Sequence, residues 1–194
     1  MPPKPRITKD MVIDAAFEVA CKEGAENISA RTVSEKLNCS TQPVMYQFAT
    51  IEALKRAAYQ KADEYHTAYL MNIPETQESI MLGIGLNYIR FALKEPHLFR
   101  FLFQSGFSLG NSLLEMVNSP ELIPVISAMQ EEMNMTLEQT KEIFITLALF
   151  VHGYASLIAN HSLEYDEELI ATYLERVCTG AISAIQEGAN EEAL

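Results

Sequence analysis

The sequence predicts an all-α protein, and three observations lead to this fold class. Apolar residues recur at helical spacing from one end of the chain to the other. Alternating apolar and polar runs bounded by hairpin turns, which would predict strands, are almost absent. Serine and threonine residues that can cap helices precede several apolar runs, and glycine or proline follows them. We therefore expect about nine helices, each with its own start and stop signals.

The first helix is expected over about residues 8–23. Thr8 is suited to cap its N-terminus, and Gly24 stands just past its end. Helical spacing places four small or β-branched residues on its inner face: Val12, Ala16, Val19 and Ala20.

The stretch Ile28–Phe48 predicts two short helices around a tight turn. The first of them follows Ser29 and ends near Leu37, and the second follows Ser40. Both serines are suited to cap a helix N-terminus. Two short helices at this spacing are typical of a helix-turn-helix, whose second helix enters the major groove of DNA.

A fourth helix is expected to begin after Thr50 and to continue to about Met71, where Pro74 marks a break. Beyond this point the predicted helices are longer and more apolar. We also expect a loop over residues 104–112 and fraying over residues 188–194. The later helices are expected at about 75–94, in the short apolar segment 96–103, and at about 120–134, 136–161 and 166–186.

The charge distribution supports a DNA-facing N-terminal part. Residues 1–61 hold nine Lys and Arg against seven Asp and Glu, a net charge of +2. Residues 62–194 hold five basic and nineteen acidic groups, a net charge of −14, which gives the whole chain −12. Contacts to phosphate need local positive charge, and an acidic surface is repelled by a polyanion. Only the N-terminal part is therefore expected to approach nucleic acid.

Composition excludes several other classes of protein. The three cysteines are widely spaced, without a CxxC pair or a histidine cluster, so we expect reduced thiols and no zinc site. The first ten residues lack the apolar core of a signal peptide, and no window reaches the roughly 18 uninterrupted apolar residues of a membrane span. No catalytic or cofactor motif is present. We expect a cytoplasmic protein that is not an enzyme and has no metal, cofactor or membrane partner. The cysteines are Cys21, Cys39 and Cys178.

The candidate DNA contacts lie around the second helix of the motif. Gln42 can pair with adenine through two hydrogen bonds, and Thr41 and Pro43 can contact a thymine methyl group. Tyr46 and Gln47 are expected to reach phosphate. The alternative is that the serines are helix caps only and the charged groups a solvated face. The full set is Ser29, Arg31, Ser40, Thr41, Gln42, Pro43, Met45, Tyr46, Gln47 and Lys55.

Residues 12–54 resemble the DNA-binding domain of TetR-family transcriptional regulators without a gap. The resemblance lies in the alanine pair and final glycine of the first helix, the turn before Ser40, the position of an aromatic pair before Phe48, and the capped fourth helix. The sequence departs from the family pattern at Ala20, at Met45 in the aromatic pair, and at Ile51, where the family usually has a phosphate-binding lysine.

The rest of the chain resembles the family more weakly. The segments EPHLFRFLF and FVHGYASLIANH are similar to the subgroup named for a Trp-His-Gly signature. His152 and Gly153 match this signature, and Val151 stands at the tryptophan position. The resemblance implies a DNA-binding domain over 1–50, a connecting helix at 51–71, and an effector-binding and dimerisation domain over 72–194.

A small apolar or amphipathic effector is the ligand that this resemblance implies. Aromatic and methionine side chains supply adaptable apolar surface for it, although such residues at helical spacing are more often ordinary core. His152 is likewise more often a hydrogen-bonded core histidine than a ligand contact. The candidates are Tyr88, Phe91, Phe103, Phe107, Met116, Met133 and His152.

Dimerisation through the last two helices is the other property that the resemblance implies. Both helices carry broad apolar stripes that include small residues, which suits pairing in a four-helix arrangement. The candidate interface residues are Phe144, Leu147, Val151, Ala155, Leu169, Tyr173, Val177 and Ala181.

Together these features predict a homodimeric, DNA-binding transcriptional regulator, a repressor that leaves a palindromic operator when it binds its effector. One alternative is a helical adaptor that binds a partner protein and no specific DNA. Another is a regulator of the same fold that has no small-molecule effector.

Overall fold

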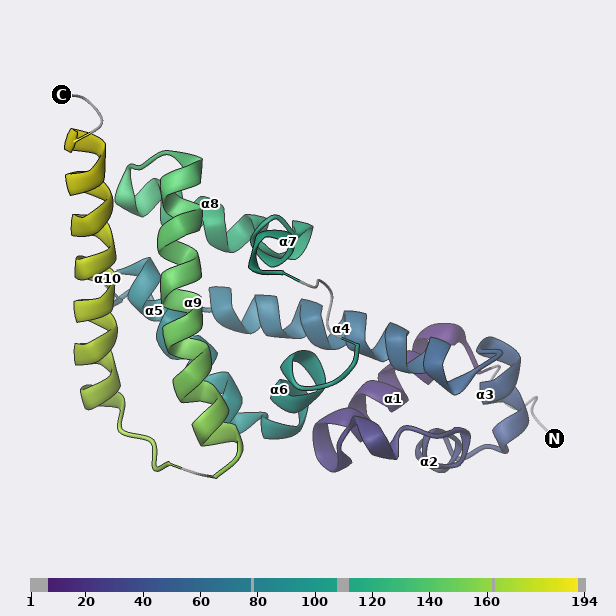
Figure 1. The fold of residues 1–194 in the computed structure, drawn as a ribbon. Coiled ribbons are helices and arrows are strands. Elements are labelled where there is room, and N and C mark those ends of the chain that lie inside the picture. Colours follow the sequence, from purple (N-terminus) through teal and green to yellow (C-terminus); the bar gives the residue numbers. More distant parts are fainter. Residues whose placement is uncertain (1–6, 78, 108–111, 162, 192–194) are drawn as a thin grey trace. The chain divides into compact units, whose positions relative to one another are not determined.

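The computed structural model describes residues 7–77, 79–107, 112–161 and 163–191, and within them the chain is all-α as predicted (Figure 1). Ten α-helices and two short 3-10 helices follow one another in these ranges, with no strand. The α-helices are α1 Lys9–Glu23, α2 Ala30–Lys36, α3 Thr41–Gln47, α4 Ile51–Met71, α5 Ile80–Lys94, α6 Pro96–Phe103, α7 Leu113–Val117, α8 Ile123–Met133, α9 Leu137–Ala159 and α10 Glu167–Glu191; the 3-10 helices are η1 Ala25–Asn27 and η2 Pro120–Leu122.

The helices α1 to α4 match the expected ranges closely. Thr8 caps α1 by accepting a hydrogen bond from the backbone N–H of Met11 at 3.2 Å. Thr50 caps α4 in the same way, accepting from the N–H of Ala53 at 3.1 Å. Gly24 ends α1 with φ of 92°, a conformation that favours glycine.

The later helices differ from the expectation in three ways. α5 begins at Ile80 rather than near residue 75, because Ser79 caps it. The sequence does not predict α7, whose five residues were expected to adjoin a loop. α10 continues to Glu191, so its expected end near residue 186 and the expected fraying of 188–191 are wrong. Residues 192–194 and part of the predicted loop, 108–111, lie outside the described residues.

The chain divides into two compact units whose bounds differ from the expected domains. Unit 1 comprises residues 1–65 and 95–108, and unit 2 comprises residues 66–94 and 109–194. The boundary therefore falls inside α4 rather than near residue 50, and α6 joins the N-terminal unit.

Unit 1 is built around a small apolar core to which all four N-terminal helices contribute. The four residues predicted for the inner face of α1 are all fully buried. Each of α2 and α3 buries a valine completely, and α4 contributes Leu54. Seven-residue helices are too short to be stable alone, so this core holds α2 and α3 in place. The fully buried residues are Val12, Ala16, Val19, Ala20, Val33, Val44 and Leu54.

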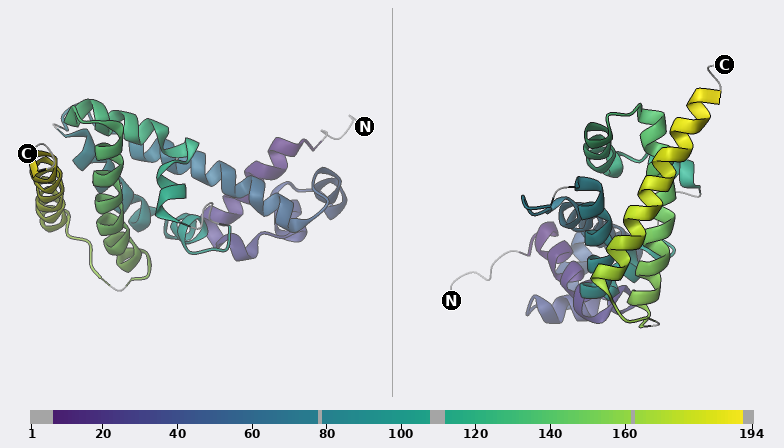
Figure 2. Two further views of the ribbon diagram at one scale, coloured as in Figure 1. Left: turned by 45° about the horizontal axis from the view of Figure 1, so that its top comes forward. Right: turned by 90° about the vertical axis from the view of Figure 1, so that its left-hand side faces the viewer.

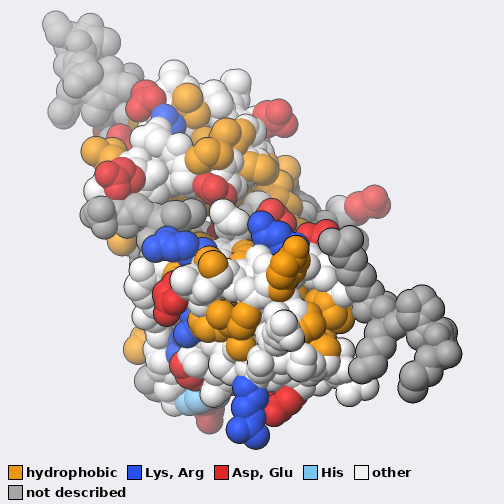
Figure 3. Space-filling model, turned by 90° about the vertical axis from the view of Figure 1, so that its right-hand side faces the viewer, with side chains coloured by type: hydrophobic (Ala, Val, Ile, Leu, Met, Phe, Trp, Pro, Cys, Tyr) orange, Lys and Arg blue, Asp and Glu red, His pale blue; other side chains and the backbone are white. Residues whose placement is uncertain are grey.

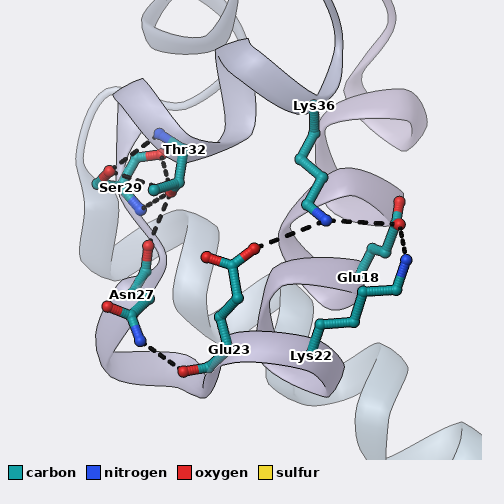
Figure 4. Close-up of polar contacts among 7 residues, drawn as sticks. All are labelled: Glu18, Lys22, Glu23, Asn27, Ser29, Thr32 and Lys36. Atoms are coloured by element: carbon teal, nitrogen blue, oxygen red, sulfur yellow. Dashed lines mark hydrogen bonds and ion pairs between the residues drawn. The ribbon is translucent and has the colours of Figure 1, made fainter.

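Polar contacts fix α2 against α1 (Figure 4). The ammonium group of Lys36 lies 3.5 Å from a carboxylate oxygen of Glu18 and 3.7 Å from one of Glu23, so it joins the end of α2 to α1. At the start of α2, Ser29 and Thr32 form a capping box: the Ser29 hydroxyl accepts from the Thr32 N–H, and the Thr32 hydroxyl accepts from the Ser29 N–H. Ser29 is thus a helix cap, as predicted.

The turn between α2 and α3 is closed by backbone hydrogen bonds. The N–H of Cys39 donates to the carbonyl of Ser34, and the N–H of Asn38 donates to that of Glu35. This pair of bonds forms a Schellman motif, with Asn38 in the left-handed region at φ 50°. Asparagine tolerates this conformation better than most residues other than glycine, so the local sequence suits the turn.

The helix α6 packs onto α1 and η1 within unit 1. The Tyr59 hydroxyl of α4 donates to the carbonyl oxygen of Leu102 at 3.2 Å, and the Tyr59 ring meets the edge of Phe101. The guanidinium of Arg56 lies over the ring of Phe107. These contacts explain why an apolar segment far along the chain belongs to the N-terminal unit.

Unit 2 is a helical bundle in which α5 lies at the centre. α5 packs against α8, α9 and α10, and α9 and α10 lie side by side (Figure 2). Ile89 and Phe91 of α5 and Ile143 of α9 are fully buried. By length and composition alone, α9 could cross a membrane, yet Ile143 and Ala155 pack one of its faces into the bundle.

A polar network joins the end of α4 to the start of α10 within unit 2. The buried amide of Asn87 donates to three backbone carbonyls, those of Tyr69, Leu70 and Asn72, at 3.2 to 3.4 Å. Its oxygen accepts from Arg90, which also binds both carboxylate oxygens of Glu167. The hydrogen bond from Arg90 holds the pKa of Glu167 down at about 2.

An aromatic cluster with two histidines lies in the same unit. The ring of His66 meets the edges of Tyr88 and Phe91, with ring centroids 5.4 and 4.8 Å apart. The Tyr88 hydroxyl lies 2.8 Å from Nδ1 of His152. Burial lowers the pKa of His66 from 6.5 to about 3, and burial also lowers the pKa of the half-buried His152. Both imidazoles are therefore neutral near pH 7.

The buried His66 predicts that the folded state loses stability in mild acid. Because the folded protein binds this proton only near pH 3 and the unfolded chain binds it near 6.5, stability is full above 6.5 and falls as the pH decreases. We expect a loss of about 2 kcal/mol between pH 6.5 and about pH 5, and a shallower loss in His66→Phe. Urea unfolding at several pH values measures it.

The matched control for this measurement is His161→Asn, which removes an exposed imidazole at a residue with positive φ. This variant should keep the wild-type dependence on pH. A wild-type slope in His66→Phe would instead assign the acid sensitivity to other groups.

Candidate nucleic-acid interface

One side of the helix α3 is buried in the core of unit 1, and the other side is exposed to solvent. Val44 is fully buried, whereas Thr41 and Gln42 are exposed, Met45 is 41% exposed and Tyr46 is 80% exposed. Tyr46 therefore offers a large ring and a hydroxyl group to a partner. Figure 3 views the molecule from the side on which α3 lies; hydrophobic side chains gather near the centre of this face, and both basic and acidic side chains lie around them.

Ser40 precedes α3 but does not cap it with its side chain, so that part of the sequence prediction is wrong. A capping serine accepts from the N–H of the second or third helical residue. The third residue of α3 is Pro43, which has no N–H. The hydroxyl of Ser40 is exposed beside the open N-terminus of α3, a position suited to an anionic partner.

The two basic residues predicted to contact DNA, Arg31 and Lys55, differ in their exposure and in their ion pairing. Arg31 is exposed and pairs with Glu35 on its own helix at 2.9 Å, a surface ion pair of the kind that contributes little to stability. Lys55 is half-buried in the first turns of α4, and it has no ion-pair partner among the residues that the structure describes. Ile51, at the position of the usual lysine, is half-buried and uncharged.

Gln47 makes a contact that the sequence does not predict. Its side-chain amide donates to the backbone carbonyl of Ile7 at 2.9 Å, across forty positions of the chain. Without DNA, the side-chain amide of Gln47 thus binds the segment before α1, and its contact with phosphate stays a prediction. Local sequence patterns do not indicate such a contact, because its two residues lie forty positions apart in the chain.

The seven candidate effector residues are divided between the two units. Phe103 and Phe107 belong to unit 1, where Phe103 meets Phe99 and Phe107 meets Phe101. The other five belong to unit 2. Among them Phe91 is fully buried, and Tyr88 and His152 are joined by a hydrogen bond. The five are Tyr88, Phe91, Met116, Met133 and His152.

The candidate dimer stripe on α9 faces inward. Leu147, Val151 and Ala155 are all buried within unit 2, and Val151 lies near Gly85 of α5. Small and β-branched residues fit this close helix packing, which is why the stripe is an internal contact. Three of the four α9 residues predicted for the interface are therefore not on the surface; Phe144 is half-buried.

The exposed apolar face of α9 and α10 is formed largely by other residues. On α10, the predicted residues Leu169 and Tyr173 are 53% and 47% exposed, while Val177 and Ala181 are half-buried. A shallow groove of about 330 Å³ lies between the two helices. Hydropathy alone could not show which side of a helix that is apolar all round would face outward. The groove is lined by Phe150, Tyr154, Leu157, Leu169, Ile170 and Tyr173.

Metal and thiol chemistry add nothing to the candidate site. Within the described residues, no three His, Cys, Asp or Glu side chains come together as metal ligands. The three cysteines carry free thiols, and burial raises the pKa of Cys21 to about 11, so that thiol is poorly reactive.

Comparison with known proteins relates the whole chain to transcriptional regulators. No protein-family profile matches the chain. It is 24% identical over 174 residues to the uncharacterized HTH-type transcriptional regulator YobS of Bacillus subtilis (strain 168), covering 88% of each protein.

Among solved structures, a TetR-family member from Streptomyces coelicolor A3 is similar with a TM-score of 0.58 and 20% identity, over 87% of this chain and 96% of that one. The multidrug binding protein EbrR complexed with ethidium is similar with a TM-score of 0.54 and 19% identity, over 87% and 97%. A transcriptional regulator from Rhodococcus sp. Rha1 is similar with a TM-score of 0.53 and 17% identity, over 94% and 97%.

The chain has the all-α fold of TetR-family proteins and, over most of its length, resembles a helix-turn-helix transcriptional regulator.

Proposed function

We propose that this protein is a transcriptional repressor that binds a palindromic DNA operator as a homodimer. The observation that carries the proposal is the exposed face of α3, with Thr41, Gln42 and Tyr46 held outward on a helix that is supported by a buried core. The net positive charge of residues 1–61 supports DNA as the partner. The proposal places the protein in the cytoplasm.

In the proposed complex, the N-terminal turn of α3 enters the major groove. Gln42 reads a base edge, Thr41 contacts a neighbouring base or phosphate, and Tyr46 lies against the backbone. Ser29, whose hydroxyl and N–H are both engaged in its capping box, acts by holding the first turn of α2, and its backbone N–H groups, near phosphate. Arg31 and Lys55 supply flanking charge.

The homodimer is proposed to form through the exposed apolar face of α9 and α10. A second copy of the chain carries the same face, so a two-fold axis brings identical apolar surfaces together. The same two-fold axis would relate the α3 helices of the two copies. Each would read one half-site, which is why the operator is expected to be palindromic.

The effector is proposed to be a small apolar or amphipathic molecule that binds unit 2 and lowers operator affinity. EbrR, a similar protein by fold, has been solved with ethidium and with malachite green, and the aromatic cluster of unit 2 would supply ring faces to such a ligand. Because α4 runs from one unit into the other, a change at its unit 2 end could alter the spacing of two α3 helices. A coupling of roughly 1 to 3 kcal/mol would reduce operator affinity about 5- to 150-fold.

Binding-site selection from random DNA with the purified protein tests the proposed function. A two-fold symmetric site is the expected result, and this site then serves as the probe for ethidium and related effectors. A folded protein that enriches no sequence would favour a protein-binding adaptor instead.

The substitutions Gln42→Ala and Tyr46→Ala are expected to weaken binding to the selected site. Loss of two hydrogen bonds to a base should cost about 1–3 kcal/mol, or roughly 5- to 150-fold, and should relax the base preference at one position per half-site. Loss of the Tyr46 contact should weaken binding to all sites alike. Fluorescence anisotropy with matched and mismatched duplexes measures both effects. The control Gln60→Ala, which removes an exposed amide from α4, should bind like the wild type.

The uncharged residue at position 51 is expected to make the dependence of affinity on salt shallow. Ile51→Lys would add one phosphate contact per protomer and steepen the slope of log affinity against log salt by about 0.9 for each contact. Titrations at several salt concentrations check this. Ile51→Gln is the neutral control, and an unchanged slope in Ile51→Lys would mean that this position does not face phosphate.

The substitutions Leu169→Glu and Tyr173→Glu are expected to separate the dimer. Burying a carboxylate in an apolar interface should cost at least about 2 kcal/mol, which raises the dissociation constant roughly 30-fold or more. Analytical ultracentrifugation measures the assembly, and circular dichroism checks the fold. Leu114→Glu alters an apolar residue of α7 that is even more exposed, and this variant should remain dimeric. A dimeric Leu169→Glu protein would place the interface elsewhere.

A further inference from the structure

Two contacts join the start of α1 to the end of α3. The ammonium group of Lys9, the first residue of α1, lies 5.4 Å from the ring centroid of Phe48, the residue that ends α3. The side-chain amide of Gln47 donates to the carbonyl of Ile7 at 2.9 Å. Phe48 is buried, so its ring is a fixed support for the lysine. The ammonium group of Lys9 is therefore held beside the helix that is proposed to read DNA.

The charge of Lys9 remains available to a partner. A contact with the face of a ring occupies one side of an ammonium group, which has three N–H donors. Lys9 is exposed, and it forms no ion pair with the residues that the structure describes. Three other lysines of unit 1, Lys22, Lys36 and Lys61, each pair with an acidic side chain of α1. Their charges are thus used within the protein, whereas that of Lys9 is not.

The length of α3 brings its C-terminal end close to the DNA backbone in the proposed complex. Its seven residues span about 10 Å at 1.5 Å per residue, and the major groove of B-DNA is about 12 Å wide. When the first turn of α3 contacts base edges, its last residues therefore lie near a strand that borders the groove. A cation at that end of the helix meets phosphate rather than bases.

The start of α4, which follows α3 after three residues, does not supply this cation. Ile51 is half-buried and uncharged, and the next residue, Glu52, is acidic. The first basic residue of α4 is Lys55, one turn further along the helix. Lys9 is therefore the residue that brings positive charge to the C-terminal end of α3.

We propose that Lys9 is a phosphate-binding residue of the DNA interface, and that Phe48 is the positioning residue that holds its ammonium group beside the end of α3. The inference rests on the proposed function. It extends the interface to the first turn of α1, beyond the two helices of the helix-turn-helix and the start of α4.

A purely structural role is the other reading of the contact between Lys9 and Phe48. In that case the contact would stabilise unit 1 and would have no part in binding DNA. The two roles differ in how the affinity for DNA depends on salt. Binding to phosphate releases counterions, so removal of one such contact lowers the slope of log affinity against log salt by about 0.9. Removal of a contact within the protein leaves this slope unchanged.

The test measures the affinity of full-length variants for the selected operator at several salt concentrations. Lys9→Gln removes the charge and keeps a long polar side chain, and Lys9→Arg keeps the charge. Lys22→Gln is the matched control, because it removes one positive charge near the other end of α1, where Lys22 pairs with Glu18. Matched and mismatched duplexes report the base preference of each variant.

Lys9→Gln should lose about 0.9 from the salt slope for each protomer, or about 1.8 for a dimer on its operator, and should keep the base preference of the wild type. Lys9→Arg should keep the wild-type slope, because a guanidinium group also binds phosphate. Lys22→Gln should match the wild type in both readouts.

A double-mutant cycle tests the role of Phe48. Phe48→Leu removes the ring and keeps a buried apolar side chain, and circular dichroism checks its fold; Phe48→Met takes its place should the leucine variant unfold. Loss of the ring should weaken operator binding when Lys9 is present and should add no further loss to Lys9→Gln. Equal losses in the two backgrounds would mean that Phe48 does not position Lys9.

Two further results would overturn the inference while the proposed function stands. One is a wild-type salt slope in Lys9→Gln, which would mean that Lys9 does not touch phosphate and serves unit 1 or another partner. The other is an equal loss of slope in Lys22→Gln, which would assign the effect to net charge rather than to a contact. Failure of the wild type to select any site would instead reject the proposed function itself.

Discussion

The candidate interface depends on one small apolar core, in which Val33 of α2 and Val44 of α3 are buried with residues of α1 and α4. Neither seven-residue helix could persist alone, because the cost of nucleating a helix is recovered only over longer segments. Burial of each valine side chain contributes roughly 1.5 to 3 kcal/mol, far more than any surface ion pair of unit 1. The core therefore determines which side chains α3 presents outward.

Much of this N-terminal arrangement can be predicted from the sequence because its signals are local. Thr8, Ser29 and Thr50 mark helix starts through their own side chains, and Gly24 marks an end through its positive φ. The buried face of α1 follows from spacing alone. Ser40 shows the limit of this reasoning: it precedes a helix, yet its side chain makes no capping hydrogen bond, and Pro43 removes one of the two N–H groups that a cap could bind.

The features that could not be predicted depend on contacts between distant segments. α6 belongs to unit 1 because Tyr59 and Phe101 meet across more than forty positions. Packing against α5 determines which face of α9 turns inward. The sequence of α9 does not indicate this face, because apolar residues lie on all sides of the helix. The bond between Gln47 and Ile7 likewise joins two elements whose separate patterns say nothing of each other.

The exposed groove of α9 and α10 has a consequence for how the protein would respond to its own abundance. Apolar surface of this kind is unfavourable in water, and the proposed pairing of two chains would remove it from water. If pairing creates the form that binds an operator, the amount of that form at low expression rises with the square of the chain concentration. Occupancy of the operator would then rise steeply above a threshold concentration of the chain. This threshold would be set by how tightly α9 and α10 pair with those of a second copy, rather than by any contact with DNA.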